Sequence, residues 1–108
     1  MTLTEVATMI AGIGLPYAYY QFDKPTRPPF ICFYYPGDHD FIADNVNYQA
    51  INRLVIELYS ENVDFTNEAA IESALKTAGL PYSRDQVYID RERIYQTTYD
   101  TEVLITNA

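Results

Sequence analysis

The sequence predicts a single α+β domain in which an antiparallel sheet carries two helices on one face and projects a hairpin or loop. Two stretches have apolar residues at helical spacing, and several runs rich in β-branched and aromatic residues surround them. The 108 residues suit one domain, with no internal repeat and no linker to divide it. Two short amphipathic helices each need an apolar surface to pack on, and the sheet supplies it. We therefore treat residues 1–108 as one domain.

The first predicted helix spans residues 2–11. Thr2 and Glu5 have the spacing of a capping box, in which each side chain bonds the backbone N–H of the other residue. One apolar face is formed at i, i+3, i+4 and i+7 by Leu3, Val6, Ala7 and Ile10.

The second predicted helix spans residues 66–78. Thr66 is the expected cap, and Phe65 is the apolar residue expected to precede it and pack on the first turn. Gly79 is expected just beyond the last turn, followed by Pro81. The inner face is predicted to consist of Ala70, Ile71, Ala74, Leu75 and Ala78.

Strands are predicted over residues 17–22, 30–35, 48–59, 87–91 and 94–106, the last two forming a hairpin. The stretch 48–59 also fits a helical spacing, but its β-branched content favours a strand. In that strand Leu54, Ile56 and Leu58 are expected to face the core. In the last strand, one face is predicted to contain Tyr95, Thr97, Tyr99, Thr101, Val103 and Ile105.

A polar, turn-rich stretch separates the two densest apolar runs. It begins with Pro36 and Gly37, a turn pattern, and we expect it to project from the sheet. Phe41 and Ile42 lie among polar neighbours there, so we expect them to be partly exposed unless a partner covers them.

Composition narrows the classes of partner. The net charge is −8, from 15 acidic and 7 basic residues, and such a chain repels nucleic acid and anionic membranes. No apolar run approaches the roughly 20 residues of a membrane span, and the acidic start carrying Glu5 does not resemble a signal peptide. The single Cys32 lies in an apolar run, where a buried structural role is expected in a reducing compartment.

No residue pattern predicts catalysis, a cofactor or a metal ion. His39 stands between Asp38 and Asp40 but has no second His or Cys at metal-ligand spacing. Glycines at expected element ends do not form a phosphate-binding loop. Arg84, together with Arg91 and Arg93, lies among acidic residues, which indicates a mixed-charge hairpin or pairing with a neighbouring subunit.

Eleven tyrosines and no tryptophan are the unusual part of the composition. Tyrosine suits both the edge of a core and a protein interface, because it has an apolar body and a polar tip. The residues alone leave both roles open.

The chain resembles the tail terminator, or tail-completion, proteins of long-tailed phages and prophages. The likeness covers nearly the whole chain and rests on the order of several short motifs. These are the first helix followed by Gly14-Leu15-Pro16-Tyr17-Ala18-Tyr19 with Phe22, then Pro28-Pro29-Phe30, Phe41-Ile42-Ala43-Asp44-Asn45 with Tyr48, Val55-Ile56-Glu57-Leu58-Tyr59-Ser60, and Asp64, Glu68, Ile71, Glu72 and Leu75.

The resemblance implies a virion structural protein of the tail or neck, assembled in the host cytoplasm. Such proteins form a hexameric ring that caps the tail tube, ends its elongation and contacts the head connector or head-closure protein. DNA passes through the lumen without sequence-specific binding, and the acidic balance suits such a wall. The resemblance brings no catalytic residues. The subunit interface is then expected at Phe41, Ile42, Asp44, Asn45 and Tyr48, followed by Tyr34 and Tyr35.

Two other functions fit the same sequence. A head–tail joining or head-closure neck protein would share the size and partners of a terminator. A monomeric ligand-binding or regulatory α+β domain would share the fold without the assembly.

Overall fold

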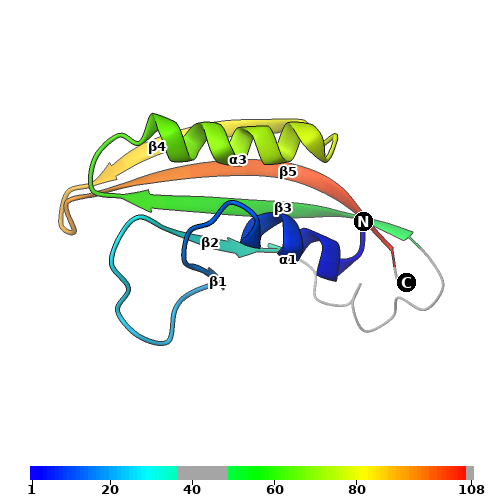
Figure 1. Ribbon diagram of the computed structural model, residues 1–108, viewed down its shortest axis with the longest axis horizontal. Coiled ribbons are helices and arrows are strands. Elements are labelled where there is room, and N and C mark those ends of the chain that lie inside the picture. The colour runs from blue at the N-terminus through cyan, green and yellow to red at the C-terminus, as the bar shows by residue number, and fades with distance from the viewer. Residues whose placement is uncertain (37–48, 107–108) are drawn as a thin grey trace.

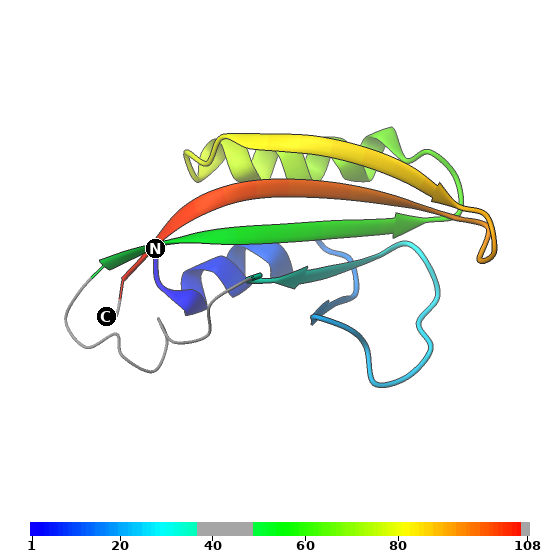
Figure 2. The same cartoon turned by 180° about the vertical axis from the view of Figure 1, so that it is seen from behind.

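The computed structural model describes residues 1–36 and 49–106, with only the backbone described at 49–51. Seven elements follow in the order α1 (Leu3–Ala11), β1 (Tyr17–Tyr19), β2 (Phe30–Tyr34), β3 (Gln49–Ser60), α3 (Phe65–Thr77), β4 (Tyr82–Ile89) and β5 (Ile94–Thr106). The strands form one sheet in the order β1-β2-β3-β5-β4. Both helices lie on the same side of this sheet, as the front and back views show (Figures 1 and 2). The predicted α+β class and the shared face of the helices are confirmed.

The sheet is antiparallel except at one edge. β2 pairs with β3, β3 with β5 and β4 with β5, all antiparallel. The short β1 pairs parallel to β2, with Tyr17 opposite Ile31 and Tyr19 opposite Phe33. The sequence predicts a strand over residues 17–22, but pairing ends at Tyr19 because Tyr20 adopts a positive φ of 72°.

The two helices begin and end for identifiable reasons. Thr2 and Glu5 form the predicted capping box at α1. At α3 the cap is Asp64, which accepts a hydrogen bond from the Asn67 N–H, so the prediction of Thr66 is wrong. Gly79 follows α3 with φ of 73°, as expected for the residue after a helix C-terminus.

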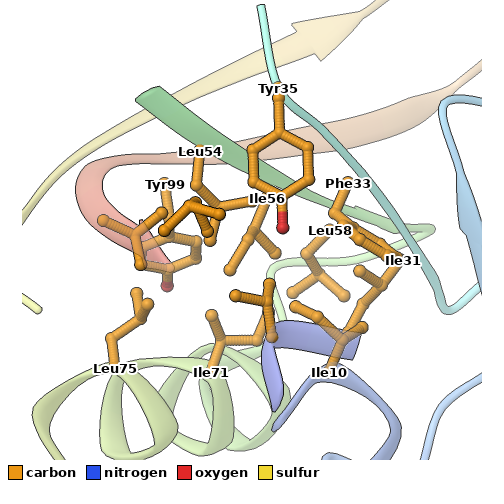
Figure 3. Close-up of a cluster of buried hydrophobic side chains, with 13 residues drawn as sticks. Ile10, Ile31, Phe33, Tyr35, Leu54, Ile56, Leu58, Ile71, Leu75 and Tyr99 are labelled. Atoms are coloured by element: carbon orange, nitrogen blue, oxygen red, sulfur yellow. The ribbon is translucent and has the colours of Figure 1, made fainter. Parts of the chain in front are cut away.

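The core fills the space between the helices and the sheet (Figure 3). Helices α1 and α3 contribute Ile10, Ile71 and Leu75, all fully buried. From the sheet come alternate residues of each strand, as the period of two requires. These are Ile31 and Phe33 of β2, Leu54, Ile56 and Leu58 of β3, and Tyr99, Val103 and Ile105 of β5.

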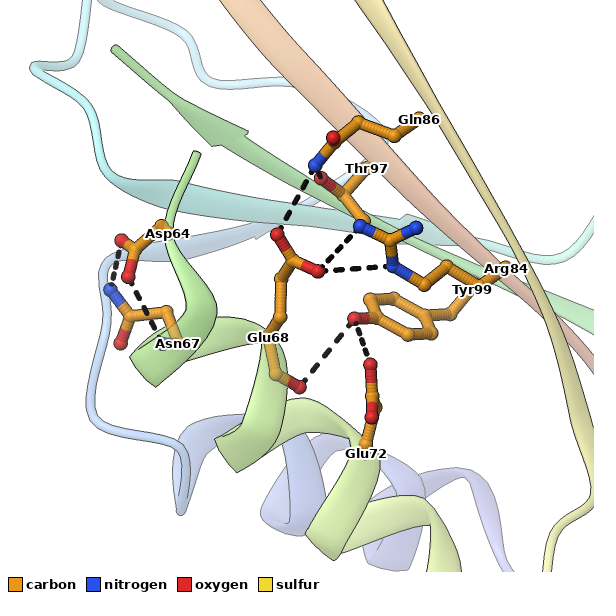
Figure 4. A network of polar contacts seen from close by, with 8 residues as sticks. All are labelled: Asp64, Asn67, Glu68, Glu72, Arg84, Gln86, Thr97 and Tyr99. Atoms are coloured by element: carbon orange, nitrogen blue, oxygen red, sulfur yellow. Dashed lines mark hydrogen bonds and ion pairs between the residues drawn. The ribbon is translucent and has the colours of Figure 1, made fainter. Parts of the chain in front are cut away.

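A polar network joins α3 to the last two strands (Figure 4). Glu68 is 4% exposed and accepts hydrogen bonds from Arg84 at 2.6 and 3.0 Å, while Gln86 donates to its other oxygen at 3.1 Å. The Tyr99 hydroxyl donates to Glu72 at 2.8 Å. These bonds satisfy polar groups that the helix and sheet would otherwise bury without partners. Arg84 therefore pairs within its own chain.

Candidate interaction surface

The face of the sheet opposite the helices carries a cluster of aromatic side chains. We call it the aromatic face and define it by Tyr20, Phe22, Phe30, Tyr34 and Tyr59. The rings of Tyr20 and Tyr34 stack with centroids 4.9 Å apart, and those of Phe30 and Tyr59 stack at 5.0 Å. Phe22 meets Phe30 edge-to-face at 5.2 Å. The rings thus form two groups on β2 and β3, and the Glu57 carboxylate lies between them.

Hydrogen bonds fix the tyrosines of this face. Glu57 accepts from the Tyr59 hydroxyl at 2.8 Å and from the Tyr34 hydroxyl at 3.3 Å. Gln96 on β5 donates to the Tyr59 oxygen at 2.7 Å. Burial and the neighbouring Glu57 carboxylate raise the pKa of both Tyr34 and Tyr59 above the ordinary tyrosine value. Both hydroxyls therefore remain protonated donors at neutral pH.

Tyr20 is held in an unusual backbone conformation at the edge of the aromatic face. Its φ of 72° is uncommon for a bulky residue and costs about 1 kcal/mol or more. Its N–H bonds the Phe33 carbonyl at 2.9 Å, and its ring lies on Tyr34. Its side chain is nevertheless 59% exposed. The fold thus holds a strained tyrosine with most of its ring in solvent.

A hollow of about 610 Å³ adjoins the aromatic face. Its floor comes from the sheet, including Phe30, Cys32 and Tyr59, and its walls come from the loop before β2 and from the β4–β5 turn. Burial, and secondarily the negative charge of Glu57, raise the pKa of the Cys32 thiol to about 11. The remaining lining residues are Tyr20, Gln21, Phe22, Lys24, Pro25, Thr26, Pro28, Glu92 and Ile94.

The predicted interface residues fall into two groups. Phe41, Ile42, Asp44, Asn45 and Tyr48 lie outside the described residues. Tyr34 lies half-buried on the aromatic face, whereas Tyr35 is 8% exposed and packs in the core on the helix side. Only Tyr34 of this pair presents its side chain at the surface of the single chain.

Sequence reasoning missed the roles of Tyr20, Phe22 and Phe65. The return of the chain from β1 to β2 places Tyr20 against Tyr34 and Phe22 against Phe30, and no local pattern predicts such contacts. Phe65 is predicted as a packed residue before the second helix, but it is the first residue of α3 and is 76% exposed. The polar residues on either side of Phe65, Asp64 and Thr66, were the sequence signal that its side chain could be exposed.

Comparison with known proteins identifies no relative: no protein-family model and no curated protein matches the chain. Among residues 1–36 and 49–106, no helix is long and apolar enough to cross a membrane. In the same part of the chain, no group of three or more His, Cys, Asp or Glu side chains is placed to hold a metal ion.

Proposed function

We propose that this chain is a ring-forming tail terminator that caps a phage tail tube, ends its elongation and joins it to the head connector. The aromatic face carries the proposal. A single domain that only needed to cover its core would not be expected to keep a stacked, hydrogen-bonded aromatic surface on the side without helices. The resemblance of the motif order to that of tail terminators is the reason to propose a phage tail as the assembly.

The arrangement of the subunit suits a ring. Its two sides differ, since one carries the helices (Figures 1 and 2) and the other carries the stacked rings of the aromatic face. Contacts between unlike surfaces build rings when the rotation between subunits closes. The net charge of −8 suits a ring whose lumen wall does not retain DNA.

Tail length tests this function. Particles assembled without this protein are expected to have overlong tails in electron micrographs, because nothing stops polymerisation of the tube. Tails of normal length that fail to attach to heads would instead indicate a head–tail joining or head-closure protein.

The hollow favours a second candidate, a monomeric ligand-binding domain. Its volume of about 610 Å³ lies within the range of small-molecule pockets. A sharp monomer mass at high protein concentration, with normal tail lengths in particles lacking the protein, would support this candidate over a terminator.

A further inference from the structure

An exposed apolar knob stands where α3 begins. Phe65 is 76% exposed, and the nearby Val63 is 40% exposed. Phe65 is the most exposed of the large hydrophobic residues in the described part of the chain. A phenylalanine in water forfeits the stabilisation that burial of its ring would give. Its position therefore favours a partner that covers it.

The hollow beside the aromatic face is lined by aromatic rings that could receive the Phe65 side chain. Phe22, Phe30 and Tyr59 line it, and their rings offer edges and faces for another aromatic ring. Phe65 does not line the hollow of its own chain, since it begins a helix on the other side of the sheet (Figure 1). Because Phe65 and the hollow lie on opposite sides of the sheet, Phe65 of one copy could fill the hollow only of another copy.

The charges around the two features are of opposite sign. Next to Phe65, residues 61–64 carry Glu61 and Asp64 and no cation. The loop that walls the hollow, residues 23–27, carries Lys24 and Arg27 against the single Asp23. Neither cation takes part in the two ion pairs of the described residues, which join Arg53 to Asp100 and Arg84 to Glu68. In a chain of net charge −8, this loop is a local positive site beside Glu92, which also lines the hollow, and it suits an acidic partner segment.

We propose that Phe65 of one copy inserts into the hollow of the next copy, with Glu61 and Asp64 set against Lys24 and Arg27. The occupant of the hollow is thus a second copy of this chain. This contact rests on the proposed ring and names the surfaces that close it. It joins the helix side of one subunit to the aromatic face of its neighbour, and such a contact between unlike surfaces fills every site when the rotation between copies closes a ring.

Truncation of the knob is the first test. Phe65→Ala is expected to weaken self-association at least about tenfold, since buried aromatic anchors dominate interface energies. Leu104→Ala is the matched control, because Leu104 is 44% exposed on β5 at the far end of the sheet from the hollow. Sedimentation velocity over a concentration series measures both variants beside the wild type, and circular dichroism checks their folding.

Directed cross-linking is the second test. In a Cys32→Ala background, a Val63→Cys variant, which keeps Phe65, is mixed with a Pro25→Cys variant and oxidised. The contact predicts disulfide-linked heterodimers in the mixture and none in either variant alone, because bridging needs Cα atoms within about 7 Å. Replacing Val63→Cys by Leu104→Cys is expected to abolish the product.

The outcomes separate this contact from the proposed function. Wild-type protein that stays monomeric at every concentration overturns the contact, as does assembly that Phe65→Ala leaves unchanged or a mixture without cross-links. None of these results changes the tail lengths expected of particles that lack the protein, which test whether it is a terminator.

Discussion

Tyr99 shows how a polar atom is accommodated in the core. Its side chain is fully buried, and its hydroxyl donates to Glu72 at 2.8 Å. Burial and the Glu72 carboxylate raise the pKa of Tyr99, so the hydroxyl stays protonated. The stability that its protonated form contributes is lost only as the pH rises above the ordinary tyrosine value of 10. The ring alone would fill the same space, so the hydrogen bond is what Tyr99 adds to the core.

Tyr99→Phe is expected to lower the free energy of unfolding by about 1.5 kcal/mol, since it removes a hydrogen bond to a charged group. Urea denaturation at pH 7 measures the change. Tyr95→Phe on the same strand is the control, because Tyr95 is only half-buried. Equal losses in the two variants would show that the bond to Glu72 contributes nothing.

Arg84 and Glu68 form the ion pair closest to the core. Arg84→Met keeps most of the apolar stem but removes both bonds to a carboxylate that is 4% exposed. We expect a loss of about 2–3 kcal/mol, because the buried charge then keeps only its bond from Gln86. The double variant Arg84→Met, Glu68→Gln is expected to recover part of this loss, and a double variant no more stable than Arg84→Met would contradict the explanation.

Cys32 is expected to resist alkylation in the folded protein. Its side chain is 5% exposed, and its pKa of about 11 leaves little thiolate at pH 8. Iodoacetamide labelling followed by mass spectrometry is expected to be slow in buffer and fast in urea. The raised pKa also means that stability declines as the pH rises beyond the ordinary thiol value near 9. Rapid labelling of the folded chain would contradict the burial of this thiol.

Two residues near the start of α3, Asp64 and Thr66, are candidates for its N-terminal cap. Asp64 accepts a hydrogen bond from the Asn67 N–H at 3.1 Å, whereas Thr66 lies inside the helix. Asp64→Ala is expected to cost about 1 kcal/mol and Thr66→Ala much less, both measured by thermal unfolding. A larger loss for Thr66→Ala than for Asp64→Ala would indicate that Thr66 is the cap, as the sequence pattern predicts.

The elements that follow a clear periodicity were predictable from the sequence. The capping box of α1, the inward face of β3 and the buried face of β5 all follow from spacing alone. β4 begins at Tyr82 and not at 87, because Arg84 and Gln86 point toward the helix side and are satisfied by Glu68. A strand whose inward positions are polar does not show the usual apolar alternation.

The candidate surface was less predictable than the core. Tyr34 was identified from the sequence, but the aromatic face also needs Tyr20 and Phe22, which the return of the chain from β1 to β2 brings against Tyr34 and Phe30. That return depends on a positive φ at Tyr20 and on contacts between residues far apart in the sequence. Neither has a local sequence pattern.

At the scale of the whole molecule, one connected core holds all the longer elements together. We therefore expect a single cooperative unfolding transition in urea, with far-ultraviolet circular dichroism and tyrosine fluorescence changing together. The test uses dilute protein, so that assembly does not contribute. Two separated transitions would show that α1 or the edge of the sheet unfolds independently of the rest.

The first residue of the chain is tied to the last strand. The Met1 ammonium donates to the Leu104 carbonyl at 2.7 Å, and the Thr106 N–H donates to the Met1 carbonyl at 2.8 Å. A purification tag fused before Met1 would replace this ammonium with a neutral amide and weaken the anchor. A fluorophore attached at Met1 would lie beside the end of β5 at Thr106, which makes this corner of the molecule a convenient place for a pair of distance reporters.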